Sequence, residues 1–168
     1  MAQTWPVLYA GSTLLILFIS TAPSRINAWL RRDGVNADWY ERARPDLAPP
    51  GAVIGTVWAL LYPTLAIALA ETLRLERSAR RDEALGFLSF NLFCNFLWTI
   101  FYFGLHNPIL SLVDILLMDL SQLAFCIHIW SVRPWISVLL WPYLLWICFA
   151  TVLNIGTVEK LSTGRGGA

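Results

Sequence analysis

The chain has 168 residues, of which 57% are hydrophobic and 14% are charged, and its mean hydropathy is +0.59. Soluble domains average roughly 45–50% apolar and about 25% charged residues, so the composition excludes an ordinary soluble core. A net charge of +1 argues against the basic surface that nucleic-acid binding requires. The composition therefore predicts a membrane protein with no nucleic-acid partner.

Five long apolar stretches are predicted to cross the membrane as α-helices, because a spanning helix needs about 20 mostly apolar residues. Backbone groups in hydrocarbon must be paired within their own segment, and the alternating pattern of barrel strands is absent. The first stretch lacks the basic start and the small-residue cleavage site of a signal peptide, so we interpret it as a retained helix. We expect an all-α membrane protein, a five-transmembrane-helix bundle forming a single domain over residues 1–168, with helices at approximately 5–22, 51–70, 84–105, 109–130 and 135–157.

The connections between these stretches differ in length. Short links after residues 105 and 130 predict that the last three helices are antiparallel neighbours. Residues 23–50 form a long predicted loop, and loops of this length are uncommon unless they have a function. Trp29, Trp39 and Tyr40 in this loop fit either an interfacial anchor or a lid over a cavity.

Polar and aromatic residues recur on one face of three predicted helices, at 100° per residue. Such residues either hold helices together within the membrane or line a shared cavity for a flat, largely apolar ligand. Because three helices carry the pattern, we favour the cavity. The residues are Trp58 and Tyr62 in the second helix, Asn91, Asn95, Trp98 and Tyr102 in the third, and Tyr143, Trp146, Ala150 and Asn154 in the fifth.

Two carboxylates, Asp114 and Asp119, fall within the fourth predicted helix. Five residues apart on a helix they point in different directions, so a paired-carboxylate site within this helix is excluded. Either a proton-coupled or a hydrogen-bonded structural role fits an intramembrane acid, and we favour the structural one. Cys94, Cys126 and Cys148 fall in apolar blocks and are expected to be buried thiols. The pattern predicts neither a metal site nor a nucleophile–base pair.

Five motifs stand out along the chain: "WY" (Trp39–Tyr40), "RPDLAPP" (Arg44–Pro50), "VWALLY" (Val57–Tyr62), "NFLWTIFYFG" (Asn95–Gly104) and "PYLLWICFATVLN" (Pro142–Asn154). They resemble those of the TspO/MBR family of tryptophan-rich sensory proteins and translocator proteins. The resemblance implies a five-helix bundle, usually a homodimer, in a bacterial envelope membrane or the mitochondrial outer membrane. It also implies a cavity beneath the first loop that binds porphyrins such as protoporphyrin IX or haem and, in animals, cholesterol and benzodiazepine-site drugs; no cofactor is required.

The same resemblance assigns ligand contacts to positions that match the family's motifs. Most of them coincide with the polar and aromatic faces described above, whereas Phe149 comes from the resemblance alone. The expected ligand-binding residues are Trp39, Ile54, Trp58, Tyr62, Asn95, Trp98, Trp146, Phe149, Ala150 and Leu153.

The chain departs from the family pattern at two places. Leu47 stands where the family usually has a tryptophan before the double proline, and Trp39 is a candidate to substitute for it. We therefore expect porphyrin to bind modestly and any light-driven degradation to be slow or absent. The animal cholesterol pattern needs aromatic residues where this chain has Ile155 and Gly156, so high-affinity sterol binding by that route is not expected.

Three functions remain open from the sequence. The favoured one is a membrane receptor or transporter-like protein that binds porphyrins and other flat apolar ligands such as sterols. The alternatives are a light-dependent porphyrin-degrading enzyme and a dimeric membrane scaffold. The expected partners are the lipid bilayer, the small-molecule ligand and a second copy of the chain.

Overall fold

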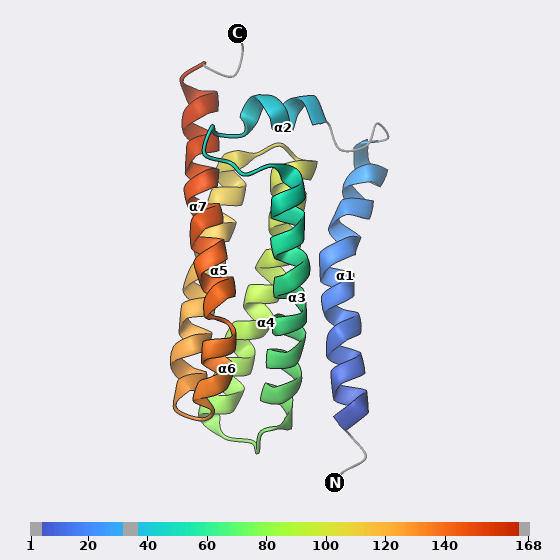
Figure 1. The fold of residues 1–168 in the computed structure, drawn as a ribbon, viewed down its shortest axis with the longest axis vertical. Helices are drawn as coiled ribbons and strands as arrows, with labels where there is room; N and C mark the ends of the chain where they lie inside the picture. The colour runs from blue at the N-terminus through green and yellow to red at the C-terminus, as the bar shows by residue number, and fades with distance from the viewer. Residues whose placement is uncertain (1–4, 32–36, 165–168) are drawn as a thin grey trace.

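The computed structural model describes residues 5–31 and 37–164, and within these residues five helical segments are long and apolar enough to cross a membrane. This confirms the predicted all-α bundle and identifies an integral multi-pass membrane protein. The spans are α1 (Trp5–Arg31), α3 (Gly51–Arg74), α4 (Ala79–Thr99) continued by η2 (Ile100–Gly104), α5 (Pro108–Trp130), and the pair α6 (Pro134–Leu139) and α7 (Trp141–Ser162) (Figure 1).

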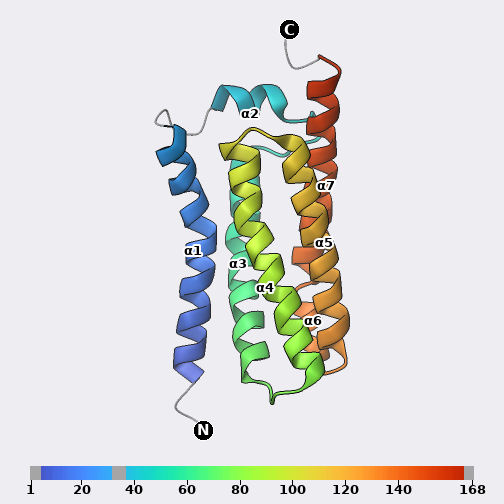
Figure 2. The same ribbon diagram turned by 180° about the vertical axis from the view of Figure 1, so that it is seen from behind.

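The short helix α2 (Ala37–Ala43) lies across one end of the bundle, between the end of α1 and α7 (Figure 1). Seen from behind, α4 and α5 cross the bundle side by side and α1 stands at its edge next to α3 (Figure 2). At the end opposite α2, the exposed indoles of Trp130 and Trp141 stack with ring centroids 6.1 Å apart, and Trp135 lies exposed nearby in sequence. Exposed tryptophans at a helix end are typical of a membrane–water interface.

The prediction of one long loop over residues 23–50 is wrong. Helix α1 continues through Pro23 to Arg31, and α2 covers residues 37–43. The apolar pattern stops near residue 22, but the buried Asn27 donates from Nδ2 to the carbonyl oxygen of Thr99 at 3.0 Å and ties this extra length to α4. Local hydropathy cannot predict a hydrogen bond between two segments so far apart in the sequence.

The fifth span is interrupted, although the sequence predicts one helix over residues 135–157. Helix α6 ends at Leu139 and α7 begins at Trp141, with Pro142 in its first turn. Pro142 has no N–H to donate to the carbonyl oxygen of Val138, and its ring would clash with that carbonyl in a continuous helix, which accounts for the break at Leu140.

Helix α4 also changes its winding, where the sequence predicts a continuous α-helix to residue 105. Over η2 the backbone hydrogen bonds join residues five apart, as in a π-helix. Leu105 N, for example, donates to the carbonyl oxygen of Ile100 at 2.8 Å. A side chain at Gly104 would overlap the amide of Asn27, so the glycine permits α1 to approach η2 closely. Short π-helical turns occur frequently at functional sites.

We expect Gly104→Ala to destabilise the protein by about 1–3 kcal/mol, because the added methyl group meets the buried Asn27 amide. Asn27→Ala alone loses one hydrogen bond, but in the double variant it removes the overlap. Thermal unfolding of the two single variants and the double variant measures the coupling. Strictly additive losses would contradict this contact.

Two of the three cysteines, Cys94 and Cys126, are buried as expected, whereas Cys148 is exposed on α7, so its predicted burial is wrong. Asp119 Oδ2 accepts a hydrogen bond from Thr151 Oγ1 at 2.7 Å, which joins α5 to α7. Asp114 is 5% exposed on α5, and its Oδ2 atom has no hydrogen-bond partner among the described residues. The Thr151 contact fits the structural role favoured for Asp119, whereas the role of Asp114 stays a prediction.

Candidate ligand cavity beneath α2

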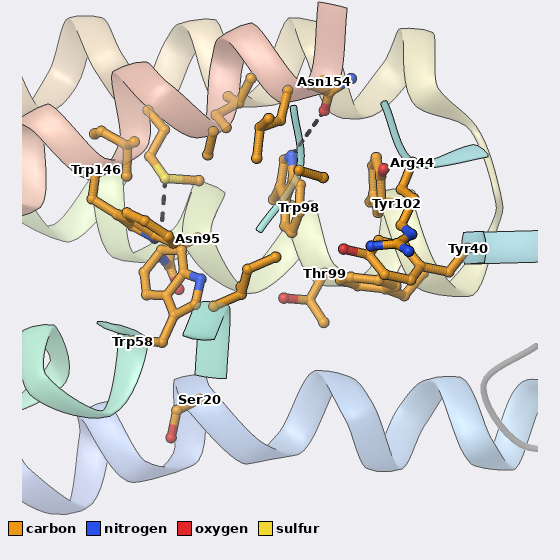
Figure 3. A pocket seen from close by; sticks show the side chains of 18 of the residues that line it. Ser20, Tyr40, Arg44, Trp58, Asn95, Trp98, Thr99, Tyr102, Trp146 and Asn154 are labelled. Carbon is orange, nitrogen blue, oxygen red and sulfur yellow. Dashed lines mark hydrogen bonds between the residues drawn. The ribbon is translucent and has the colours of Figure 1, made fainter. Parts of the chain in front are cut away.

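A cavity of about 240 Å³ lies between α3, α4, η2, α5 and α7, with α2 at one end (Figure 3). Its lining is mainly aromatic and apolar. Every residue predicted to contact a ligand lines it except Trp39 and Phe149, so the cavity gathers Ile54, Trp58, Tyr62, Asn95, Trp98, Trp146, Ala150 and Leu153.

Flat ring faces form the walls of the cavity. Trp58 stacks on Tyr62 with centroids 5.3 Å apart and meets Trp146 edge-on at 6.5 Å. Trp98 stacks on Tyr102 at 4.8 Å with 13° between the ring planes. Aromatic surfaces in this arrangement present both faces and edges to a flat guest.

Most polar groups around the cavity already have partners within the protein. Asn154 accepts from Trp98 Nε1 at 3.1 Å and donates to the carbonyl oxygen of Pro108 at 2.8 Å. Trp98 and Asn154 therefore do both: they line the cavity and they join helices through hydrogen bonds.

One donor differs from the others. Trp146 Nε1 is buried and has no hydrogen-bond partner among the described residues, although its ring lines the cavity. A buried donor without a partner costs about 1–3 kcal/mol. A ligand that carries a hydrogen-bond acceptor would satisfy this indole.

The deeper end of the cavity rests on a buried hydrogen-bond network. Tyr143 donates from its hydroxyl to Asn91 Oδ1, and Asn91 Nδ2 donates to the carbonyl oxygen of Met118, each at 2.8 Å. Asn95 makes longer contacts of 3.4 Å with Tyr62 and Tyr143. The network joins α3, α4, α5 and α7 and holds the lining helices in place.

The outer end of the cavity carries a cation. Arg44 lines it, as does Tyr40 from α2, whose ring lies 5.6 Å from that of Phe103 (Figure 3). The Arg44 guanidinium pairs with Glu41 at 2.8 Å and remains partly exposed to solvent. Burial raises the pKa of the Tyr40 hydroxyl, so this group is a neutral donor at physiological pH.

The segment after α2 is fastened to α7. Lys160 donates from Nζ to the carbonyl oxygen of Arg44 at 3.0 Å and lies 3.6 Å from the Asp46 carboxylate. A Cβ at Gly156 would lie 2.9 Å from the Pro45 side chain, so the glycine provides the room for this approach. These contacts attach the cover of the cavity, by which we mean α2 and residues 44–50, to α7.

The comparison with known proteins agrees with this architecture, because the chain matches the TspO/MBR family over residues 5–159. The chain belongs to the TspO/MBR family. It is 37% identical over 118 residues to the tryptophan-rich protein TspO of Archaeoglobus fulgidus, covering 69% of this chain and 75% of the relative. It is 33% identical over 133 residues to the protein CrtK of Rhodobacter capsulatus (76% and 80% covered) and 30% identical over 138 residues to the translocator protein of Homo sapiens (80% and 81%). Homodimerisation of this TspO/MBR chain stays a prediction.

Trp39 and Phe149 support the TspO/MBR cavity from outside its lining. Trp39 stacks on His106 with ring centroids 4.2 Å apart and meets Tyr102 edge-on at 5.4 Å, so it fastens α2 to the neighbouring segment. Phe149 contacts Trp146 at 5.6 Å from the flank of α7. Leu47, at the family's usual tryptophan position, is 64% exposed and is not part of the lining.

The structure adds lining residues that the sequence did not predict. Ile115 and Met118 fit a buried face of α5, since they are three residues apart and almost fully buried. Phe103 falls within a recognised motif, but the direction of its side chain depends on the fold. Ser20 and Thr99 carry no sequence signal, because only the approach of α1 and the turn into η2 brings them to the cavity.

Proposed function

We propose that this TspO/MBR protein is a membrane receptor or transporter-like protein that binds flat, largely apolar acids of the porphyrin class in the cavity beneath α2. The observation that carries the proposal is the joining of aromatic walls, formed by Trp58, Trp98 and Trp146, to the cation of Arg44 at the outer end. The names of the relatives, a tryptophan-rich sensory protein and a translocator protein, agree with a receptor or transport role.

A porphyrin has two features that suit this site: a flat ring with accessible π faces and two carboxylates on one edge. The ring stacks on the indole faces, and its π face accepts the N–H of Trp146. The carboxylates turn toward the Arg44 guanidinium and the Tyr40 hydroxyl, where water also reaches them. Charge-assisted guanidinium–carboxylate bonds are the strongest of these contacts.

The size of the cavity limits how the guest enters. At about 240 Å³ it is smaller than the roughly 300–1,000 Å³ typical of pockets for drug-sized ligands. A macrocycle therefore requires outward movement of α2 and the segment that follows it, against the contacts of Lys160 with Arg44 and Asp46. Because this displacement costs free energy, we expect modest affinity.

A second candidate function is light-dependent degradation of the bound porphyrin. The observation that favours it is the gathering of three indole rings around one cavity, since indoles can serve as redox partners of an excited guest. The exposed Leu47 favours the receptor over the degrading enzyme, because at this position the chain has no tryptophan that could contact a bound porphyrin.

Titration of the purified protein in lipid nanodiscs with protoporphyrin IX tests the proposal. In the dark we expect saturable quenching of tryptophan emission with about one porphyrin per chain and micromolar affinity, which corresponds to roughly 8 kcal/mol. Subsequent illumination of the complex should leave the porphyrin absorbance unchanged relative to free porphyrin in the same nanodiscs. Protein-dependent bleaching would support the degrading enzyme, and absence of saturable binding would contradict both functions and leave the scaffold.

A further inference from the structure

Helix α1 is held against the rest of the bundle near its two ends. At the beginning of the helix, the Arg74 guanidinium lies 3.8 Å over the ring of Trp5, and the Tyr9 hydroxyl donates to Glu71. Toward the other end, Asn27 donates to the carbonyl oxygen of Thr99. Between these attachments, a groove lies between α1 and α3.

The groove between α1 and α3 has a volume of about 520 Å³ and is almost entirely apolar. Ile16 and Leu17 line it from α1, while the small residues Gly55, Ala59 and Ala66 line it from α3. A Cβ added at Gly55 would meet no atom within 4 Å, so the structure leaves space in front of this residue. Small residues on α3 thus keep the groove open along its length.

The groove is continuous with the lipid-facing surface of the two spans. Leu14 and Leu60, each next in sequence to a lining residue, are 67% and 69% exposed, and in a bilayer these side chains contact acyl chains. From residue 55 to residue 67 the lining of α3 extends about 18 Å at 1.5 Å per residue. One leaflet of the hydrocarbon core is about 15 Å thick, so the groove has the length of a single acyl chain.

The groove and the central cavity share a wall. Trp58, Tyr62 and Ser20 line both spaces, with the indole of Trp58 between them. In the close view, Trp58 projects from α3 toward the cavity residue Trp146, and Ser20 lies on α1 on the side of Trp58 away from Trp146 (Figure 3). A chain lying in the groove would therefore contact the outer side of the wall that faces the ligand.

We propose that the groove between α1 and α3 is a binding site for one acyl chain of a membrane phospholipid, seated against Trp58 and Tyr62. The occupant is hydrocarbon because the lining offers almost no polar atoms and opens to the bilayer rather than to water. Its contact with Trp58 supports the indole from the lipid side. The bilayer thereby completes one wall of the central cavity.

Quenching of tryptophan emission by brominated lipid tests this site directly, because bromine quenches an indole only at close contact. The protein is placed in nanodiscs of phosphatidylcholine with or without bromine in the middle of the acyl chains. The difference between wild type and Trp58→Phe isolates the emission of Trp58. We expect brominated lipid to remove about half or more of that emission, as direct contact within 4–4.5 Å implies.

Gly55→Phe places a ring in the groove and should restore most of the Trp58 emission in brominated lipid. Gly11→Phe is the matched control: Gly11 is an exposed glycine of α1 with no neighbouring atom within 4 Å, and it does not line the groove. This control should leave the quenching unchanged. Ala59→Phe, at a second groove position, repeats the test should Gly55→Phe lower the melting temperature.

Two results would overturn the proposal. One is Trp58 emission that is insensitive to brominated lipid, which would mean that the groove excludes acyl chains. The other is equal quenching in Gly55→Phe, Ala59→Phe and Gly11→Phe, which would mean that lipid reaches Trp58 by another path. The test contains no porphyrin, so its failure leaves the proposed ligand function untouched, and failure of that function leaves this site untouched.

Discussion

Replacing Ala150 with phenylalanine should weaken porphyrin binding at least about 100-fold, equivalent to roughly 2.7 kcal/mol. Ala150 lines the cavity on α7 between Trp146 and Leu153, where its small side chain leaves space for the guest. A phenylalanine ring would fill much of a cavity of about 240 Å³. Titration with protoporphyrin IX in nanodiscs measures the loss, and thermal unfolding shows whether the fold persists.

The matched control is Ala52→Phe, at an exposed position of α3 that does not line the cavity. It adds the same ring to the same kind of helix and should leave porphyrin affinity unchanged. Unchanged affinity in Ala150→Phe, with a normal melting temperature, would show that the porphyrin binds elsewhere on the protein.

Arg44→Gln should weaken binding of the porphyrin diacid about 10-fold and leave binding of its uncharged dimethyl ester nearly unchanged. Hydrogen bonds to charged groups are worth about 1.5–3 kcal/mol, and partial solvent exposure of Arg44 places the effect at the lower end. Glutamine keeps the main-chain bond to Lys160, so the cover over the cavity stays attached. The wild-type preference for the diacid should decrease as salt rises.

Arg42 provides the control for this charge. The sequence treats Arg42 and Arg44 alike, as cations of one segment, but the structure places only Arg44 at the cavity, with Arg42 exposed on α2. Arg42→Gln should therefore change neither affinity. Equal losses for the diacid and the ester in Arg44→Gln would assign Arg44 a structural role instead of a role in recognising the acid. Arg32, which the sequence offers as a further cation of the same segment, lies outside the described residues.

The helices and the cavity faces could be predicted because both are local in the chain. Apolar stretches of spanning length mark the five spans, and the 100° periodicity puts Asn95 and Trp98, or Trp146 and Ala150, on one face. Periodicity gives the direction of a side chain relative to its own helix. When three helices each present such a face, a bundle brings the faces together, and this is the arrangement observed.

What the sequence did not predict depends on contacts between distant segments. The extension of α1 relies on Asn27 meeting Thr99, 72 residues away. The close approach of α1 to η2 relies on the absence of a side chain at Gly104, which faces Asn27. The motif predicts Trp39 in the ligand site, yet its ring stacks on His106, which has a positive φ of 51° and lies beyond η2. Local hydropathy and spacing contain none of these relationships.

The indole N–H signals of the nine tryptophans, observed by ¹H–¹⁵N NMR, test most directly whether the cavity is the porphyrin site. Single Trp→Phe variants assign the signals, and protoporphyrin IX is then added in the dark. We predict large ring-current shifts for Trp58, Trp98 and Trp146, and unchanged signals for Trp130, Trp135 and Trp141 at the other end of the bundle. Shifts confined to the second group, or no shifts at saturating porphyrin, would contradict the cavity as the binding site.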